Sequence, residues 1–132
     1  MSTSSRLGVV NEDGTVLSVY CHWDGDPDYL GVSLESCYKN VKDIHELMSK
    51  GDLSAIESNV DWNNEPHDGP LYYADRNEDC PAILGTYEEF LSLCDDQGCE
   101  YFYLFKDGQW VAHYSDGEEI PRNEWGIDSW LR

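Results

Sequence analysis

The stretch from residue 100 to residue 114, EYFYLFKDGQWVAHY, decides the fold because it predicts a β-hairpin. Its two arms, residues 100–105 and 109–114, are rich in aromatic and other β-prone residues. Between them lie Lys106, Asp107 and Gly108, and an Asp-Gly pair between β-prone arms is a strong hairpin signal. We therefore expect two antiparallel strands joined by a tight turn.

A second hairpin of the same kind is predicted near the amino end of the chain. Residues 6–11 and 15–22 are its two arms, and Glu12, Asp13 and Gly14 form the turn between them. We expect the two hairpins to share one antiparallel sheet, with two or three helices packed on one of its faces.

The helices are predicted between the two hairpins. Apolar residues follow helical spacing between residues 32 and 50, with a break near Asn40 and a stop at Gly51. Thr86 and Glu89 fit a capping box, which predicts a helix that runs to Asp96. The segments between them are interpreted as a short helical turn, a long loop and a short strand, at residues 52–56, 59–70 and 71–74 respectively.

These elements predict an α+β fold in a single acidic domain that spans residues 1–132. Hydrophobic residues make up 40% of the chain, which is enough to bury a core. The chain carries 27 acidic side chains against 8 Lys and Arg, for a net charge of −19. Because Lys and Arg must neutralise phosphates, this composition argues against direct binding to nucleic acid or to an anionic membrane. A partner is expected to be basic.

The five cysteines are interpreted as reduced thiols of a cytoplasmic protein. Five is an odd number, no apolar run follows Met1, and no stretch is long enough to span a bilayer. Two disulfides with one free thiol would instead need an oxidising compartment. The spacing fits no paired zinc knuckle, and Cys21 and His22 are neighbours on a strand, so they point to opposite faces. We expect buried structural thiols, no cofactor and no enzymatic role.

The stretch WDGDPDYLGVSLE, residues 23–35, raises the alternative of an ion site. Tyr29 takes the place where a calcium loop needs glycine, and the residues before the stretch read as strand rather than helix. We interpret the stretch as a polar loop between a strand and a helix. The alternative function is a small-ligand or metal-ion site within residues 19–35. Its calcium ligands would be the four acids at positions 1, 3, 5 and 12 of the loop, Asp24, Asp26, Asp28 and Glu35.

Residues 19–25, VYCHWDG, followed by Pro27, Gly31 and Leu34, resemble the signature of a family of small acidic bacteriophage proteins. In that family a hairpin leads into Tyr-Cys-His-Trp-Asp-Gly-Tyr-Pro and then into helical segments. The longer stretches RLGVVNEDGTVLSVYCHWDG and YFYLFKDGQWVAHY are also similar, so the resemblance covers most of the chain. This chain has Asp26 where the family has tyrosine, so the triple-Asp pattern is local to it. The resemblance implies a phage origin and no particular activity.

The distribution of the acids favours the hypothesis that the chain imitates DNA. Residues 51–132 hold nineteen acids and four bases. Carboxylates two apart on a strand repeat at about 6.6 Å, and those three or four apart on a helix lie about 5–6 Å apart, so rows of acids can imitate phosphates. We expect the chain to bind and inhibit a basic host protein that binds nucleic acid, such as a defence or transcription factor. The expected contact residues are fourteen acids and two tryptophans: Asp61, Glu65, Asp68, Asp75, Glu78, Asp79, Glu88, Glu89, Asp95, Asp96, Asp116, Glu118, Glu119, Glu124, Trp62 and Trp125.

Overall fold

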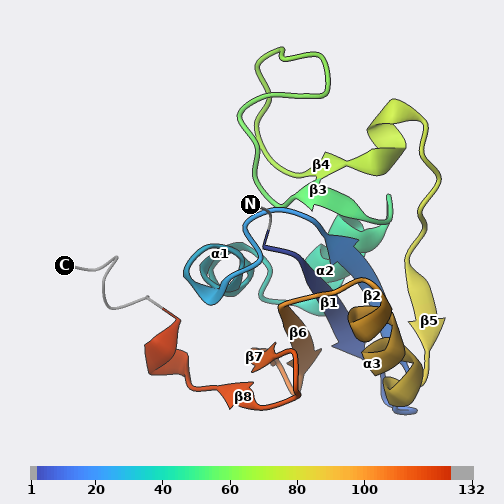
Figure 1. The fold of residues 1–132 in the computed structure, drawn as a ribbon, viewed down its shortest axis with the longest axis vertical. Coiled ribbons are helices and arrows are strands. Elements are labelled where there is room, and N and C mark those ends of the chain that lie inside the picture. Colours follow the sequence, from blue (N-terminus) through green and yellow to red (C-terminus); the bar gives the residue numbers. More distant parts are fainter. Residues whose placement is uncertain (1–2, 126–132) are drawn as a thin grey trace.

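The computed structural model describes residues 3–125, which form a mixed eight-stranded sheet with three α-helices (Figure 1). None of the helices in this part of the chain is long and apolar enough to span a membrane. The helices are α1 (Val32–Cys37), α2 (Val41–Met48) and α3 (Tyr87–Asp96), with short helical turns η1 (Pro27–Gly31), η2 (Tyr73–Arg76) and η3 (Arg122–Glu124). The strands are β1 (Ser5–Val10), β2 (Val16–Cys21), β3 (Leu53–Ala55), β4 (Leu71–Tyr72), β5 (Ile83–Gly85), β6 (Tyr101–Lys106), β7 (Gln109–Tyr114) and β8 (Glu119–Ile120).

Both predicted hairpins are present. β1 pairs antiparallel with β2, and β6 pairs antiparallel with β7, each in a continuous register. In the second turn Asp107 and Gly108 have φ angles of 54° and 80°. A two-residue turn of this twist requires positive φ at both central residues, and Asp-Gly adopts this geometry readily. The local pattern in the sequence therefore located this turn correctly.

The sheet is mixed, so the expectation of a purely antiparallel sheet is wrong. The strand order is β4-β3-β2-β1-β6-β7-β8, and β5 pairs with β2 beside this path. β1 and β6 are the first strands of the two hairpins, and they lie next to each other in parallel. β2 and β3 are also parallel. A hairpin signal fixes the pairing within each hairpin, but it does not say which strands of the two hairpins become neighbours.

Helices cover both faces of the sheet, so the expectation of helices on one face is also wrong. Leu34 of α1 and Ile44 of α2 pack into a core cluster with Tyr103 of β6. The next residue of β6, Phe102, packs into a second cluster with Phe90 of α3. Successive residues of a strand point to opposite faces. The central strands are therefore apolar on both sides, and one helical layer could not cover both.

The local expectations between the hairpins are confirmed in part. The break near Asn40 separates α1 from α2, because the Asn40 side chain caps α2 by accepting a hydrogen bond from the backbone of Asp43. Gly51 follows α2 with a φ of 86°. The helical turn expected at residues 52–56 is wrong, since residues Leu53–Ala55 form β3. The strand expected at residues 71–74 is shorter, and η2 begins at Tyr73.

Candidate partner-binding face

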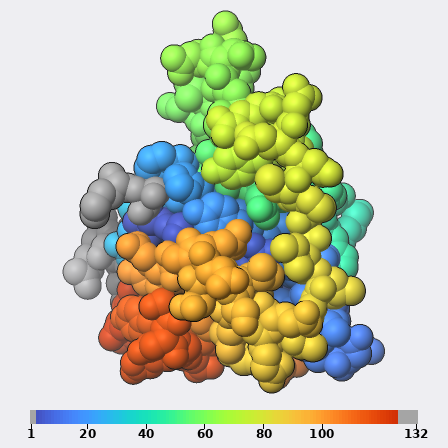
Figure 2. Space-filling view, turned by 45° about the vertical axis from the view of Figure 1, so that its right-hand side comes forward, coloured from blue at the N-terminus to red at the C-terminus, as the bar shows by residue number. Residues whose placement is uncertain are grey.

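Residues 57–100 run along one side of the molecule. Figure 2 shows this segment, from green through yellow to orange, continuing from the top of the molecule into its lower half. It holds twelve acids and one base, Arg76. All of these acids are exposed except Asp61, which is half-buried. We call this set the acidic face: Glu57, Asp61, Glu65, Asp68, Asp75, Glu78, Asp79, Glu88, Glu89, Asp95, Asp96 and Glu100.

Few cations offset the charge of the acidic face. Between residues 3 and 125 there are three ion pairs, and two of them involve this face. Lys50 Nζ lies 2.5 Å from Asp75 Oδ1, and the guanidinium of Arg76 contacts Glu78. The ten other carboxylates of the face have no ion-pair partner in the described part of the chain. The face therefore presents a negative field that is largely uncompensated within the molecule.

The predicted capping box fixes the start of α3 and with it the carboxylates along this helix. Thr86 Oγ1 accepts a hydrogen bond from the backbone N–H of Glu89 at 3.1 Å, and Glu89 Oε1 accepts one from the backbone N–H of Thr86 at 2.9 Å. The hydrogen bond from the Thr86 backbone N–H to the Glu89 carboxylate, aided by the Thr86 side chain, holds the pKa of Glu89 below its usual value, because it favours the charged form. Further along the helix, Asp95 and Asp96 are exposed to solvent.

A hydrogen-bonded turn orders the loop at the other end of the acidic face. Asp61 Oδ1 accepts hydrogen bonds from the backbone N–H groups of Glu65 at 3.0 Å and Asn63 at 2.8 Å. Both bonds lower the pKa of Asp61, so its carboxylate stays ionised over a wide pH range. The loop thus holds Asp61 in a fixed position rather than on a freely rotating side chain.

The two tryptophans expected at the interface differ in exposure. Trp62 is half-buried, and its Nε1–H donates to the carbonyl of Tyr72 at 2.8 Å. The guanidinium of Arg76 lies 4.1 Å from the Trp62 ring centroid. Trp125 is only 1% exposed, and its Nε1–H donates to the carbonyl of Ile120 at 3.1 Å. The expectation that Trp125 contacts a partner is therefore wrong, because its indole is part of the core.

The acids at residues 116–124 form a second group, which follows β7 in the chain. Asp116, Glu118 and Glu119 lie in and after the turn between β7 and β8, and Glu124 lies in η3. All four are exposed. Asp116 Oδ1 accepts a hydrogen bond from the backbone N–H of Glu118 at 2.9 Å, which stabilises the turn. Glu119 lines the same groove as Tyr87, the first residue of α3, so this group adjoins the start of that helix.

The four acids of the calcium-like loop do not form a metal site. Among residues 3–125 no group of three or more His, Cys, Asp or Glu side chains could hold a metal ion. Glu35 instead pairs with Arg122, whose Nη1 lies 2.6 Å from Glu35 Oε1. The carbonyl of Asp26 accepts hydrogen bonds from the backbone N–H groups of Tyr29 and Leu30 in η1, and Asp24 has a φ of 56°. Asp24, Asp26, Asp28 and Glu35 thus belong to a turn and a helix start.

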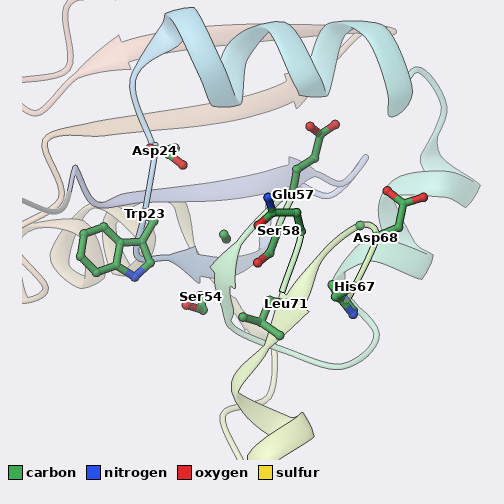
Figure 3. A pocket seen from close by; sticks show the side chains of 11 residues that line it. Trp23, Asp24, Ser54, Glu57, Ser58, His67, Asp68 and Leu71 are labelled. Carbon is green, nitrogen blue, oxygen red and sulfur yellow. The ribbon is translucent and has the colours of Figure 1, made fainter. Parts of the chain in front are cut away.

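An open cavity of about 580 Å³ lies beside this loop, and the sequence pattern did not reveal it. Trp23 and Asp24 line one side of it, and His67 and Asp68 line the other (Figure 3). Glu57 also borders the cavity. An exposed indole beside several carboxylates suits an organic cation, because the ring face and the carboxylates both attract positive charge. The segments meet only in the fold, since they are more than thirty residues apart in the chain.

The cysteines are all free thiols. Cys21, Cys94 and Cys99 are buried, as expected, and Cys80 is half-buried, whereas Cys37 is exposed and contradicts the expectation. Burial raises the pKa of Cys21 to about 12, so this thiol stays protonated at neutral pH. Cys21 therefore behaves as a small core side chain.

Comparison of the chain with family models, with curated proteins and with solved structures finds no match. The resemblance to small acidic phage proteins therefore stays a prediction. Any functional assignment rests on the chemistry of the sites described above.

Proposed function

We propose that this chain is an acidic interaction protein that binds a basic nucleic-acid-binding protein and blocks its nucleic-acid site. The observation that carries the proposal is the acidic face, in which one base accompanies twelve acids and ten carboxylates have no ion-pair partner among the described residues. A groove that binds phosphates is lined by Lys and Arg, and such a groove would receive this face in the same way.

The spacing and rigidity of the carboxylates support imitation of a polyanion. Duplex DNA carries one charge per about 1.7 Å of its axis, counted over both strands. α3 carries two pairs of neighbouring acids, Glu88 with Glu89 and Asp95 with Asp96. The pairs are seven residues, or about two turns and roughly 10 Å, apart, so they lie along one side of the helix. Capping at Thr86 and the turn around Asp61 restrict where these groups can move. Complementary fields would steer the two proteins together and make association fast and strongly dependent on salt.

The resemblance to phage proteins adds a biological setting to the proposal. A phage protein acts in the cytoplasm of a bacterial host, where the basic nucleic-acid-binding proteins include defence and transcription proteins. In this role the chain needs no catalytic group and no cofactor. It acts by occupying a groove that nucleic acid would otherwise fill.

The experiment is capture of a basic protein from bacterial lysate on the immobilised chain at low and at high salt, with duplex DNA as competitor. A variant with Glu88→Gln, Asp95→Asn and Asp96→Asn removes three charges from the acidic face. The matched control removes three from the opposite side of the sheet, with Asp28→Asn, Asp43→Asn and Glu46→Gln.

We expect one dominant basic protein that is released by salt and by DNA. Its affinity should fall about tenfold or more for the acidic-face variant and much less for the control. Capture that DNA does not compete, or an equal loss in both variants, would contradict the proposal. An equal loss would mean that only total charge matters.

A second candidate function is binding of a small organic cation in the cavity beside Trp23. The observation that favours it is the exposed indole, which faces a cavity that Asp24, Glu57 and Asp68 also line. Calorimetric titration with spermidine tests it, with Asp24→Asn as the variant and Asp28→Asn as the control on the same loop. We expect binding that Asp24→Asn weakens and Asp28→Asn leaves unchanged. Equal weakening by both would indicate nonspecific attraction to a negative surface.

A further inference from the structure

Strand β5 has a free edge on the acidic face. β5 pairs with β2 through Val16↔Gly85, Leu17↔Leu84 and Ser18↔Ile83, and no other strand of residues 3–125 pairs with it. Figure 1 shows β5 at the margin of the sheet, to the right of β2 and α3. Its outer backbone groups therefore face away from the sheet.

This edge is apolar, although its surroundings are strongly charged. Leu84 is 61% exposed and Ile83 is 41% exposed, and both lie within the acidic segment. Free edges in natural proteins are usually kept short, as β5 is with three residues, or are protected by charged side chains, proline or a bulge, because an unprotected edge pairs with other chains. The three residues of β5 carry none of these side chains. An exposed aliphatic edge of this kind is suited to receiving a strand.

A groove on the face of the sheet that carries α3 offers room for side chains beside β5. It has a volume of about 380 Å³ and lies between β5 and α3. Gly85 keeps it open, because a Cβ at this position would lie only 3.2 Å from the Cβ of Glu89. The floor is apolar and the rim is acidic, with residues Val16, Ile83, Phe90, Glu88, Glu89 and Asp96 among those that line it.

We propose that the free edge of β5 takes up an extended segment of the basic partner as an additional strand. In strand addition the backbone hydrogen bonds supply affinity, and pockets for alternate side chains supply specificity. Ile83 and Gly85 face the groove beside α3, and Leu84 points to the other side of the strand. Lys or Arg side chains on one side of the segment would therefore pair with Glu88 and Asp96, and aliphatic side chains on its other side would contact Leu84. The inference rests on the proposed function for the charge of the partner, but it adds the mode of binding and the sequence pattern of the bound segment.

The test uses two synthetic peptides of eight residues in which lysine alternates with valine. The second peptide carries N-methyl groups on every other residue, which remove backbone hydrogen-bond donors along one edge but leave charge and side chains in place. Affinity is measured by fluorescence anisotropy, and protection of the amide protons of residues 83–85 is measured by NMR hydrogen exchange. Leu84→Ser is the protein variant, and Val41→Ser on α2, 45% exposed, is its matched control.

We expect the unmodified peptide to bind at least tenfold more tightly than the N-methylated one, and to slow exchange at residues 83–85. Leu84→Ser should weaken binding, and Val41→Ser should not. If both peptides bind equally and salt removes both, strand addition is wrong while the proposed function stands. If neither peptide binds but the basic protein is still captured, the inference fails alone. If capture also fails, both proposals are contradicted.

Discussion

Arg6 is completely buried although its guanidinium carries a full positive charge. Its Nε–H donates to Ser18 Oγ at 2.8 Å, and its Nη1–H donates to Gln97 Oε1 at 2.9 Å. Burial lowers the pKa of Arg6, and the charge of Asp52 opposes this effect. Arg6 thus links the central strands to the residue that follows α3, through bonds that satisfy its donors away from water.

We expect Arg6→Ala to lower the free energy of unfolding by about 3 kcal/mol, because it leaves a cavity and removes the partners of buried polar groups. Urea denaturation at pH 7 measures the change. Lys42→Ala is the control, because Lys42 is exposed on α2 and forms no ion pair among the described residues, and such surface substitutions change stability by about 0.5 kcal/mol or less. Similar losses for both variants would contradict this account of Arg6.

His113 should make stability depend on pH. Its ring is buried and stacks on Phe102 at a centroid distance of 4.5 Å, and its Nδ1 has no hydrogen-bond partner among the described residues. Burial lowers the pKa of His113, and the nearby Glu119 opposes this. Between the lowered pKa and the ordinary value near 6.5, the unfolded chain binds more protons than the folded chain. The contribution of neutral His113 to the free energy of unfolding is therefore complete above pH 6.5, and it is lost as the pH falls from 6.5 toward the lowered pKa.

We expect His113→Phe to remove this dependence and to be more stable than the wild type by about 1 kcal/mol at pH 7.5, since an unpaired buried polar atom is removed. The advantage of the variant should grow as the pH falls to about 5.5. Urea midpoints at several pH values measure the difference. His45→Gln, on the exposed side of α2, should keep the pH dependence of the wild type. A constant difference between His113→Phe and the wild type would contradict the assignment.

At the scale of elements, Gly8 sets how closely α3 lies on the sheet. A Cβ at this position would lie 2.5 Å from Val16 Cγ1 and 3.3 Å from Phe90 Cε1. Gly8→Ala should therefore lower the free energy of unfolding by about 1–3 kcal/mol, through overpacking. If the clash with Val16 is the cause, Gly8→Ala should cost much less in a Val16→Ala background, and a double-mutant cycle from urea denaturation measures this coupling. Strictly additive losses in the free energy of unfolding would show that the clash with Val16 is not the cause.

The elements that could be predicted from sequence are those whose signals are local. The turn at Asp107, the break at Asn40 and the cap at Thr86 each depend on a few neighbouring residues, and all three are confirmed. β3 was missed because its three residues become a strand only by pairing with β2 and β4. The parallel contact of β1 with β6 joins strands more than ninety residues apart, and no local pattern reports it.

At the scale of the whole molecule, composition predicted that the acids would be exposed, because ionised side chains are rarely buried without a partner. Composition did not predict which of the acids share a face, since that depends on how residues 57–100, which include β5 and α3, run along the molecule. The same limit explains Trp125, whose loop-like neighbours indicated exposure although the fold buries its indole. The cavity beside Trp23 was missed because its walls come from distant segments.

The net charge of −19 should make the stability of the whole molecule rise with salt. Like charges repel each other more in the compact state than in the unfolded chain, and the described residues contain only three ion pairs that would be weakened by screening. The Debye length falls from about 30 Å at 0.01 M salt to about 10 Å at 0.1 M, so most of the effect should occur at low salt.

We expect sodium chloride at 0.3 M to raise the free energy of unfolding by about 1 kcal/mol relative to 0.01 M, with an unchanged denaturant slope. Urea denaturation across this range measures it. The variant with Glu88→Gln, Asp95→Asn and Asp96→Asn should be more stable than the wild type at 0.01 M and should gain less from salt. A urea midpoint that stays constant or falls with salt would show that the ion pairs outweigh the repulsion. The carboxylates of the acidic face would then not repel each other strongly in the folded state.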